Sequence, residues 1–512
     1  MLVFAAGTVG GAVGLLLPEL VSLGVVDGGN ARLAIGIGAL TFGVLVTAGA
    51  VAGDLLGHVR VQFVGAVLFT VASLGAATTT NPWVFLVALA VQGAGAALAV
   101  PAVVGYARAQ LPAIERAVGY ALFALAFVAG PPLGVLLNQE LVENVDWHAL
   151  FWILTGAGAL AAGTGVGLLR QRIPVRIDPA RLLVALLATG GALGILLPLT
   201  GWDVTTWPAW VAVPVGLGVL LFAGCLVLEG NRQGWRPGLG APLIALLVTA
   251  GAAHLTILVI YLEVVAGESA HSVALLGYPI AACAVLGAGT AVVLAMWVDG
   301  RIAVAAGAAL MALGMIVPLI VLIADPASLR TGLVALDAAA GGLGLTLVIA
   351  TLMRRGQLRG TGQPSAGQPS GWPAIAGQPG GWPAIAGQPG AGQPGAGQPS
   401  AWRPSVWRPS AGPGPVFAAL AIGTASAGAL SSLLFDRQQR QLPYGSLLGG
   451  GLSSMRNTAV SVMIASIALL AGAVILALLL GPRGTESAGP HLVVPTDSGP
   501  EPLALTDGGA SG

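Results

Sequence analysis

The sequence places a few ionisable side chains inside long apolar stretches, where they could bind and release protons. His254 and Asp337 lie well inside such stretches, whereas Glu19 and Glu263 lie near the ends of theirs. A charged group is costly to bury in hydrocarbon, so such residues usually face a polar cavity, an ion path or a partner. For His254 and Asp337 we weigh a cavity-lining position equally against burial inside the protein. For Glu19 and Glu263 the simpler interpretation is a carboxylate that reaches water from a helix end.

Helical spacing relates two further side chains to His254. Tyr261 follows it by seven residues, so the two share one face of a helix. Glu263 points to nearly the opposite side. The sequence therefore predicts that His254 and Tyr261 face the same neighbours and that Glu263 does not.

A short polar segment at residues 53–60 joins two other apolar stretches and reads Gly-Asp-Leu-Leu-Gly-His-Val-Arg. Its charged members, Asp54 and Arg60, fall at the ends of the two flanking helices. Asp54 can accept hydrogen bonds from the start of a neighbouring helix and form a charge pair that breaks when the helices move. With Gly53 and Gly57 they form a candidate conformational gate. The alternative is a solvated loop salt bridge, worth less than about 1 kcal/mol.

The elements that must hold these residues follow from an unusually apolar composition. Of 512 residues, 56% are hydrophobic and 8% are charged, and the mean hydropathy is +0.89. A soluble protein could not bury so much apolar surface, because single cores stop growing at about 250–300 residues. Runs of about 20 apolar residues recur, each long enough to cross a hydrocarbon layer of about 30 Å as a helix. The sequence therefore predicts an all-α integral membrane protein.

Composition and motifs also exclude several functions. The net charge is +1 and no basic patch interleaved with aromatic residues occurs, so we expect no nucleic-acid partner. No Walker loop or His-Glu-x-x-His pattern occurs, so we expect no nucleotide, metal or cofactor. Residues 267–271 faintly resemble a nucleophile elbow but lack its closing glycine and its strand–turn–helix setting. We therefore do not expect an enzyme. Cys225 and Cys283 lie in apolar stretches and are expected to be packing residues.

Apolar stretches long enough to span a bilayer number about fourteen. They lie near residues 2–25, 33–53, 61–79, 83–107, 117–137, 148–169, 181–200, 208–228, 242–265, 272–295, 301–323, 331–353, 415–435 and 457–480. With both termini in the cytoplasm, most of the 21 arginines fall in cytoplasmic loops, as the positive-inside rule requires. The exceptions are Arg32, Arg330, Arg437, Arg440 and Arg456. The predicted location is the plasma or inner cell membrane.

These stretches divide the chain into predicted units. Residues 1–170 form an amino-terminal six-helix bundle, 171–230 add two linking helices, and 231–353 with 414–482 form a carboxy-terminal six-helix bundle. Residues 354–413 are rich in Gly, Pro, Gln and Ser and repeat a decapeptide, which predicts a disordered cytoplasmic linker. The tail at 483–512 is predicted to be disordered as well.

Further motifs follow one another in the first half of the chain. Residues 92–97 read Gln-Gly-Ala-Gly-Ala-Ala, residues 130–134 read Gly-Pro-Pro-Leu-Gly, and residues 147–151 read Trp-His-Ala-Leu-Phe. In this order and spacing, and together with the 53–60 segment, they resemble the conserved motifs of the major facilitator superfamily. The number of spans is similar to that of the fourteen-span drug:proton antiporters in this family.

The resemblance is strongest over residues 40–160, and it has a weaker counterpart in the second half. There Tyr-Leu-Glu at 261–263 and Asp-Gly-Arg at 299–301 occupy the corresponding places.

Each motif also has a physical rationale of its own. Small residues such as Gly93, which follows Gln92, allow close helix contact in lipid. The pair Gly130 and Pro131 frees a backbone carbonyl and permits a bend. In the family this second motif, which ends here at Gly134, is associated with antiporters. A simple kink is an equally good interpretation.

The chain also departs from the family pattern. Leu89 stands where the family has an arginine linked to proton coupling, and Val9 stands where fourteen-span members commonly carry an aspartate. In the 53–60 segment Leu55, His58 and Val59 stand in place of the usual arginines, which leaves Arg60 as the basic end. The 130–134 motif has Ala126 and Val135 in place of its outer glycines.

The resemblance implies a transporter in which two bundles flank a central cavity and rock about it in alternating access. We expect export of small apolar or amphipathic compounds, with substrate, lipid bilayer and protons as partners. Proton coupling would require Asp337, His254 or Glu263 to replace the missing family residues. The alternatives are an uncoupled facilitator, or a membrane scaffold that recruits a partner through residues 354–413.

Overall fold

The computed structural model describes residues 3, 5, 31–166, 179–201, 209–232, 240–325, 328–358 and 450–479, and within them every regular element is a helix. The elements of the first half are α2 (Ala31–Leu56), α3 (His58–Thr78), α4 (Pro82–Gln110), α5 (Ala113–Asn144) and α6 (His148–Val166). They are followed by α7 (Pro179–Gly201), the short η2 (Ala209–Val211) and α8 (Ala212–Arg232). The second half contains α9 (Gly240–Val264), α10 (Ala270–Ala274), α11 (Gly277–Trp297), α12 (Gly300–Ala324), α13 (Thr331–Leu358) and α15 (Gly450–Leu479).

The described helices agree with the hydropathy prediction, with end shifts of up to about two turns. The predicted span at 272–295 is divided, because α10 ends at Ala274 before α11 begins at Gly277. Nine helical segments of the described chain are long and apolar enough to cross a membrane. Predicted spans 2–25 (except residues 3 and 5) and 415–435 lie outside the described residues, as do residues 359–413 of the predicted linker and the 483–512 tail. Residues 354–358, predicted as the start of the disordered linker, instead form the end of α13, because no proline interrupts the helix there.

Local sequence signals explain where several helices start. The Asn81 side chain accepts hydrogen bonds from the backbone of the first turn of α4, and Pro82 is the first helical residue. Asp299 caps α12 by accepting from the Arg301 amide at 3.1 Å. Capping of this kind satisfies amides that have no partner within the helix.

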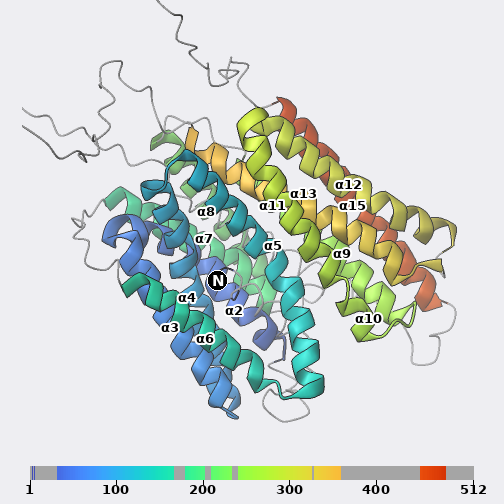
Figure 1. The fold of residues 1–512 in the computed structure, drawn as a ribbon, viewed down its shortest axis with the longest axis horizontal. Helices are drawn as coiled ribbons and strands as arrows, with labels where there is room; N and C mark the ends of the chain where they lie inside the picture. Colours follow the sequence, from blue (N-terminus) through green and yellow to red (C-terminus); the bar gives the residue numbers. More distant parts are fainter. Residues whose placement is uncertain are drawn as a thin grey trace, which may run out of the picture.

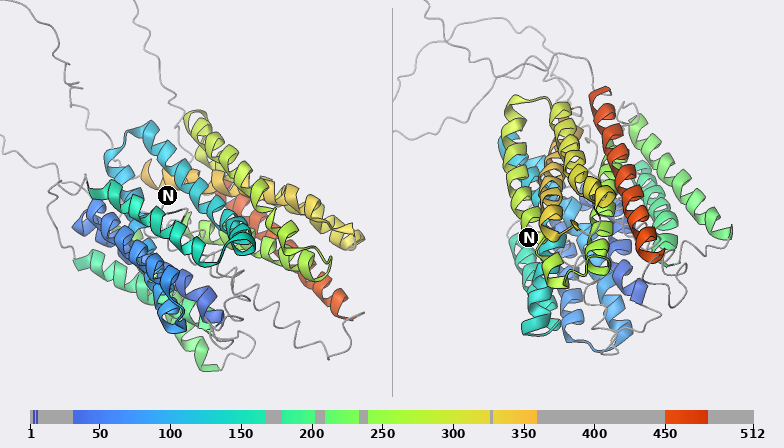
Figure 2. Two further views of the ribbon diagram at one scale, coloured as in Figure 1. Left: turned by 60° about the horizontal axis from the view of Figure 1, so that its bottom comes forward. Right: turned by 90° about the vertical axis from the view of Figure 1, so that its right-hand side faces the viewer.

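The helices form two groups that lie side by side in Figure 1, one of blue to teal helices and one of yellow-green to red helices. In the first group, α4 packs between α2 and α3, and α3 also packs on α6. In the second group, α13 packs against both α11 and α12, and α15 lies along α12 and α9 (Figure 2). Large apolar side chains such as Leu122, Leu186 and Leu220 are exposed on the outer faces, as expected where lipid is the solvent.

Glycine pairs set the closest helix crossings in both groups. In α4, a Cβ at Gly93 would collide with the Gly38 carbonyl of α2, and one at Gly95 would lie 2.7 Å from the Gly65 carbonyl oxygen of α3. Residues two apart on a helix point about 200° apart, so the pair lets α4 approach two neighbours at once. Close approach through small residues is how helices associate in lipid.

The second group repeats this arrangement. In α13, a Cβ at Gly342 would collide with the carbonyl of Ile280 on α11, and one at Gly344 would lie 2.5 Å from the carbonyl oxygen of Gly307 on α12. The two groups therefore share a packing plan in which a central helix carries a Gly-x-Gly triplet.

The two groups meet along α5, which packs against α11 and α13. One apolar core contains Tyr120 and Ala124 of α5, Ala288 of α11 and Met353 of α13. Further along α5, the start of α11 packs directly on the α5 backbone. A Cβ at Gly277 would lie 2.8 Å from the Pro132 carbonyl oxygen.

Candidate functional site

The turn between α2 and α3 has a geometry that only a few residue types can adopt. Gly57 has φ of 99°, and its amide donates to the Gly53 carbonyl at 3.0 Å. A positive φ of this kind is strained for a residue with a side chain. Gly57 therefore ends α2 and starts α3 within one residue, and it fixes where Asp54 and His58 lie.

Asp54 has an ion pair, and its partner comes from another helix. Its Oδ2 lies 2.8 Å from Nη1 of Arg181 in the first turn of α7, and its Oδ1 lies 3.6 Å from Nε2 of His58. Arg181 and Asp54 side chains are 16% and 20% exposed. Arg60, the basic end of the predicted gate, is exposed and makes no ion pair within the described residues. The gate acid is thus paired with Arg181 of α7 and not with Arg60.

His58 occupies a slot between two glycines. A Cβ at Gly105 on α4 would lie 2.5 Å from its Cε1, and a Cβ at Gly53 on α2 would lie 2.8 Å from its Nδ1. The His58 Nδ1 atom is buried and has no hydrogen-bond partner among the described residues. The slot explains why residue 53 is glycine, because any larger residue would displace the His58 imidazole.

The second cluster lies inside the second group of helices. Nε2 of His254 on α9 lies 3.0 Å from Oδ2 of Asp337 on α13, and the two side chains are each 1% exposed. Among the buried side chains described, they are the only histidine and the only carboxylate. The structure therefore brings together the two residues that the sequence placed deepest in apolar stretches, and it packs them against each other inside the helix group.

Hydrogen-bond chemistry defines how many protons this pair holds. Nδ1 of His254 lies 3.1 Å from the Ala250 carbonyl oxygen, which can only accept, so Nδ1 carries a hydrogen. A second hydrogen must lie between Nε2 and Oδ2, because otherwise two lone pairs would face each other. The pair is then either imidazolium with carboxylate or neutral imidazole with carboxylic acid, and it has no net charge in either form.

The other Asp337 oxygen faces a small residue. Oδ1 is buried and has no hydrogen-bond partner among the described residues. A Cβ at Gly314 on α12 would lie 3.2 Å from it. Sequence reasoning missed Gly314, because nothing in its own surroundings shows that α12 faces the carboxylate there.

The remaining acidic candidates lie apart from this pair. Glu263 is exposed near the end of α9, whereas Tyr261 is buried with 3% exposure on the same side as His254. The opposition of Glu263 to the His254 face stays a prediction. Glu19 lies outside the described residues, as does Val9.

The family-like motifs of the first half serve packing. The Gln92 amide donates to Ser73 Oγ at 2.7 Å, and Ser73 donates in turn to the Phe69 carbonyl, so Gln92 joins α4 to α3. Gly93 faces α2, as described above. Leu89, at the position of the missing arginine, is 1% exposed.

The second motif runs through α5 without a break. Gly130 and Gly134 are buried, Pro131 is half-buried, and α5 continues to Asn144. The neighbouring Pro132 supplies the carbonyl that meets α11. This motif therefore lies at the contact between the two helix groups.

The start of α6 is held by an aromatic cluster. Trp147 is 1% exposed and meets the rings of Phe85 and Phe151 edge to face, with centroids 5.7 and 6.0 Å apart. Outside the spans, burial alone would raise the pKa of Asp146. The hydrogen bond with His148 at 2.9 Å, the His148 charge and the backbone amides of His148 and Trp147 together outweigh burial and lower that pKa.

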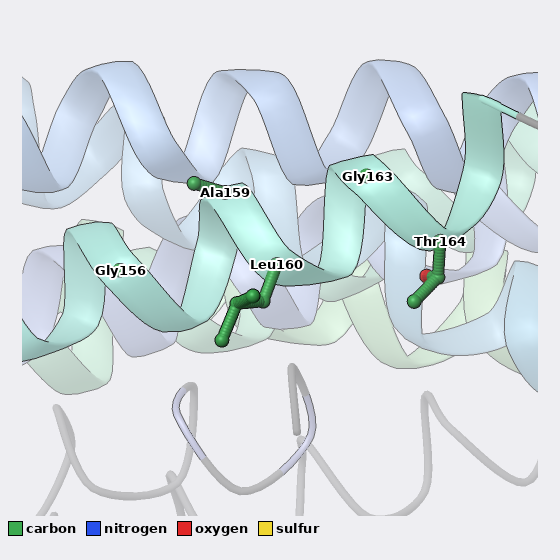
Figure 3. A pocket seen from close by; sticks show the side chains of 5 residues that line it. All are labelled: Gly156, Ala159, Leu160, Gly163 and Thr164. Atoms are coloured by element: carbon green, nitrogen blue, oxygen red, sulfur yellow. The ribbon is translucent and has the colours of Figure 1, made fainter.

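A hollow along α6 is bordered by Gly156, Ala159, Leu160, Gly163 and Thr164 (Figure 3). These residues carry no ionisable group. The hollow therefore adds nothing to the two charged clusters.

The described architecture is that of a multi-pass helical membrane protein with an ion pair at a helix junction and a buried proton-holding pair in one half. The major facilitator superfamily model matches residues 1–366, and the chain belongs to that family.

Several relatives carry names of export proteins. The chain is 30% identical over 238 residues to the probable actinorhodin transporter of Streptomyces coelicolor, a match covering 45% of this chain and 40% of that protein. It is 32% identical over 300 residues to the cephamycin export protein of Amycolatopsis lactamdurans, covering 54% and 60% of the two chains. A tetracenomycin C resistance and export protein of Streptomyces glaucescens is 25% identical over 193 residues, covering 36% and 35%. The matches span about 35 to 60% of these relatives' lengths.

Solved structures with the same fold cover nearly the whole chain. A human organic anion transporter matches with a TM-score of 0.51, covering 92% of this chain and 98% of that one. A proton:xylose symporter matches with a TM-score of 0.50, covering 94% and 95%. Both are 14% identical, so they show the fold alone.

Proposed function

We propose that this chain exports small apolar or amphipathic compounds by alternating access, and that it exchanges protons at the His254–Asp337 pair. Membership of the family supports transport, and the export proteins among the relatives support the outward direction. The proposed topology has about fourteen spans with both termini in the cytoplasm.

The pair is the observation that carries the proton step. It holds one shared proton beside a carboxylate oxygen that has no hydrogen-bond partner among the described residues. Losing that proton would leave a net negative charge at a site of 1% exposure, which is costly without a new partner or water. Release of the proton should therefore accompany a movement of α9 relative to α13 that admits water.

The substrate class follows from the scarcity of charge. Within the described residues the buried polar side chains other than this pair are neutral: Thr47, Ser73, Gln92, Thr346, Thr351 and Ser466. A site built from such groups suits an apolar or amphipathic compound better than a strongly charged one.

Inverted membrane vesicles test the proposal. An imposed proton gradient should drive uptake of actinorhodin or cephamycin, the compounds named for two relatives, and a protonophore should abolish it. Asp337→Asn should lower gradient-driven uptake by about tenfold or more, because a neutral amide cannot release the proton. Glu263→Gln is the matched control, since Glu263 is exposed on the same element as His254.

The buried Leu89 at the family's arginine position favours an uncoupled facilitator as the second candidate. Uptake that persists unchanged with the protonophore, and in Asp337→Asn, would establish the facilitator and contradict proton exchange at the pair.

A further inference from the structure

The inserted helix α7 is attached to α2 at two levels. Near one end, Arg181 pairs with Asp54. Further along, an apolar cluster of four buried side chains joins the helices: Leu40 and Val44 from α2 with Ala192 and Leu196 from α7. On both helices the two contacts are separated by ten to fifteen residues, or about 15–22 Å at the α-helical rise. Residue numbers fall along α2 from Asp54 to Leu40 and rise along α7 from Arg181 to Leu196, so the two helices run antiparallel.

The attachment to α7 compensates for a positive charge that is missing from the 53–60 segment. The 53–60 segment has a histidine where the family motif that it resembles has an arginine, and its remaining arginine, Arg60, is exposed without an ion pair in the described chain. The 2.8 Å contact supplies from α7 the positive charge that the segment lacks. A hydrogen-bonded pair of this length is of the stronger, charge-assisted kind.

Arg108 near the end of α4 lies within electrostatic range of Asp54 and Arg181, so α4 of the first half also borders the pair.

We propose that Arg181 is the positioning residue of the Asp54 gate, and that through this ion pair the inserted helices α7 and α8 move with the first half during the transport cycle. The proposal rests on the alternating-access function above. It adds a role for the inserted pair, which otherwise packs chiefly on α2 and on itself.

The test measures loosening of the α2–α7 contact directly, without a substrate. In a chain with Cys225→Ser and Cys283→Ser, the substitution Ala192→Cys places one thiol at a site of 1% exposure in that contact. Maleimide labelling of this thiol in membranes should become about three- to tenfold faster with Arg181→Gln, because α7 then loses one of its two attachments to α2. Arg181→Lys should label at nearly the parent rate.

Two controls separate the loss of the Arg181–Asp54 ion pair from a general loss of packing. Arg60→Gln removes an arginine of the same segment that has no described ion pair, and it should leave labelling unchanged. Combining Asp54→Arg with Arg181→Asp should restore slow labelling that either substitution alone has accelerated.

The proposal is overturned if Arg181→Gln lowers the melting temperature but leaves labelling unchanged, or if the exchanged pair labels as fast as the single variants. A parent chain that fails to transport would contradict the proposed function alone, since the labelling rates are measured without substrate.

Discussion

At the scale of single residues, the hydrogen count at His254 limits what a substitution of Asp337 can do. Nδ1 donates to the Ala250 carbonyl, so Nε2 requires a donor whenever the imidazole is neutral. A carboxylic acid provides that donor and can also release it as a proton. An amide provides the donor only. Stability and proton exchange can therefore be separated at this one position.

Asp337→Asn should melt close to the parent protein, because its amide can donate to Nε2 of His254. Asp337→Leu leaves that nitrogen buried without a donor and should cost about 1–3 kcal/mol of unfolding free energy. Thermal denaturation in detergent, followed by circular dichroism, compares the two. Equal losses for both variants would argue against the assigned hydrogen on Nδ1.

At the scale of helices, the shared feature is a central helix that meets two neighbours through glycines on opposite sides. The crossings are set by backbone carbonyls, which cannot move aside as a side-chain tip can. Added volume at such a crossing must separate the helices and lose contacts over their length. An exposed glycine such as Gly289 of α11 lacks this constraint.

Gly287 and Gly289 of α11 provide a matched comparison. A Cβ at Gly287 would lie 2.6 Å from the Leu343 carbonyl oxygen, whereas one at Gly289 meets no atom within 4 Å. We expect Gly287→Ala to cost on the order of 1–3 kcal/mol through overpacking, and Gly289→Ala to be neutral or slightly stabilising. Steric-trap unfolding in bicelles measures both. Similar effects of the two substitutions would contradict the crossing geometry.

At the scale of the whole molecule, α5 joins the two helix groups along its middle part. The contact extends from Tyr120 to Pro132, and the start of α11 packs on the motif at 130–134. Rocking of one group against the other must open part of this seam. A side chain added at Gly277 would press directly on α5 at this contact.

Gly277→Val should open the seam at the α11 start, since its first carbon would already lie 2.6 Å from Leu136 Cδ1. Ala129→Cys, at a site of 3% exposure in the same core, reports this when it is the sole cysteine and leaves Leu136 in place. Maleimide labelling should become faster by about tenfold, which corresponds to a shift of about 1.4 kcal/mol between two states. Labelling that stays slow would show that packing at the α5–α11 contact does not control the equilibrium between the closed and open states.

Sequence patterns predicted the helices well, because lipid imposes a minimum apolar length that is visible in one dimension. They also identified His254 and Asp337 as costly to bury. They could not pair them, because 83 residues separate the two and helical periodicity relates only near neighbours. The partner of Asp54 was missed for the same reason, since Arg181 lies 127 residues away. Nothing in the sequence around Gly105 indicates that His58 packs against it.

The isolation of the His254–Asp337 pair has a practical consequence for spectroscopy. The chain contains only five histidines, and His254 is 0% exposed. Isotope-labelled histidine would therefore give a sparse set of imidazole nitrogen resonances, in which a water-excluded ring bonded at both nitrogens should stand apart. The two forms of the pair differ in whether Nε2 or Oδ2 holds the hydrogen, and nitrogen chemical shifts distinguish these directly. The protein thus carries an intrinsic probe that can report the proton's position while a substrate is added.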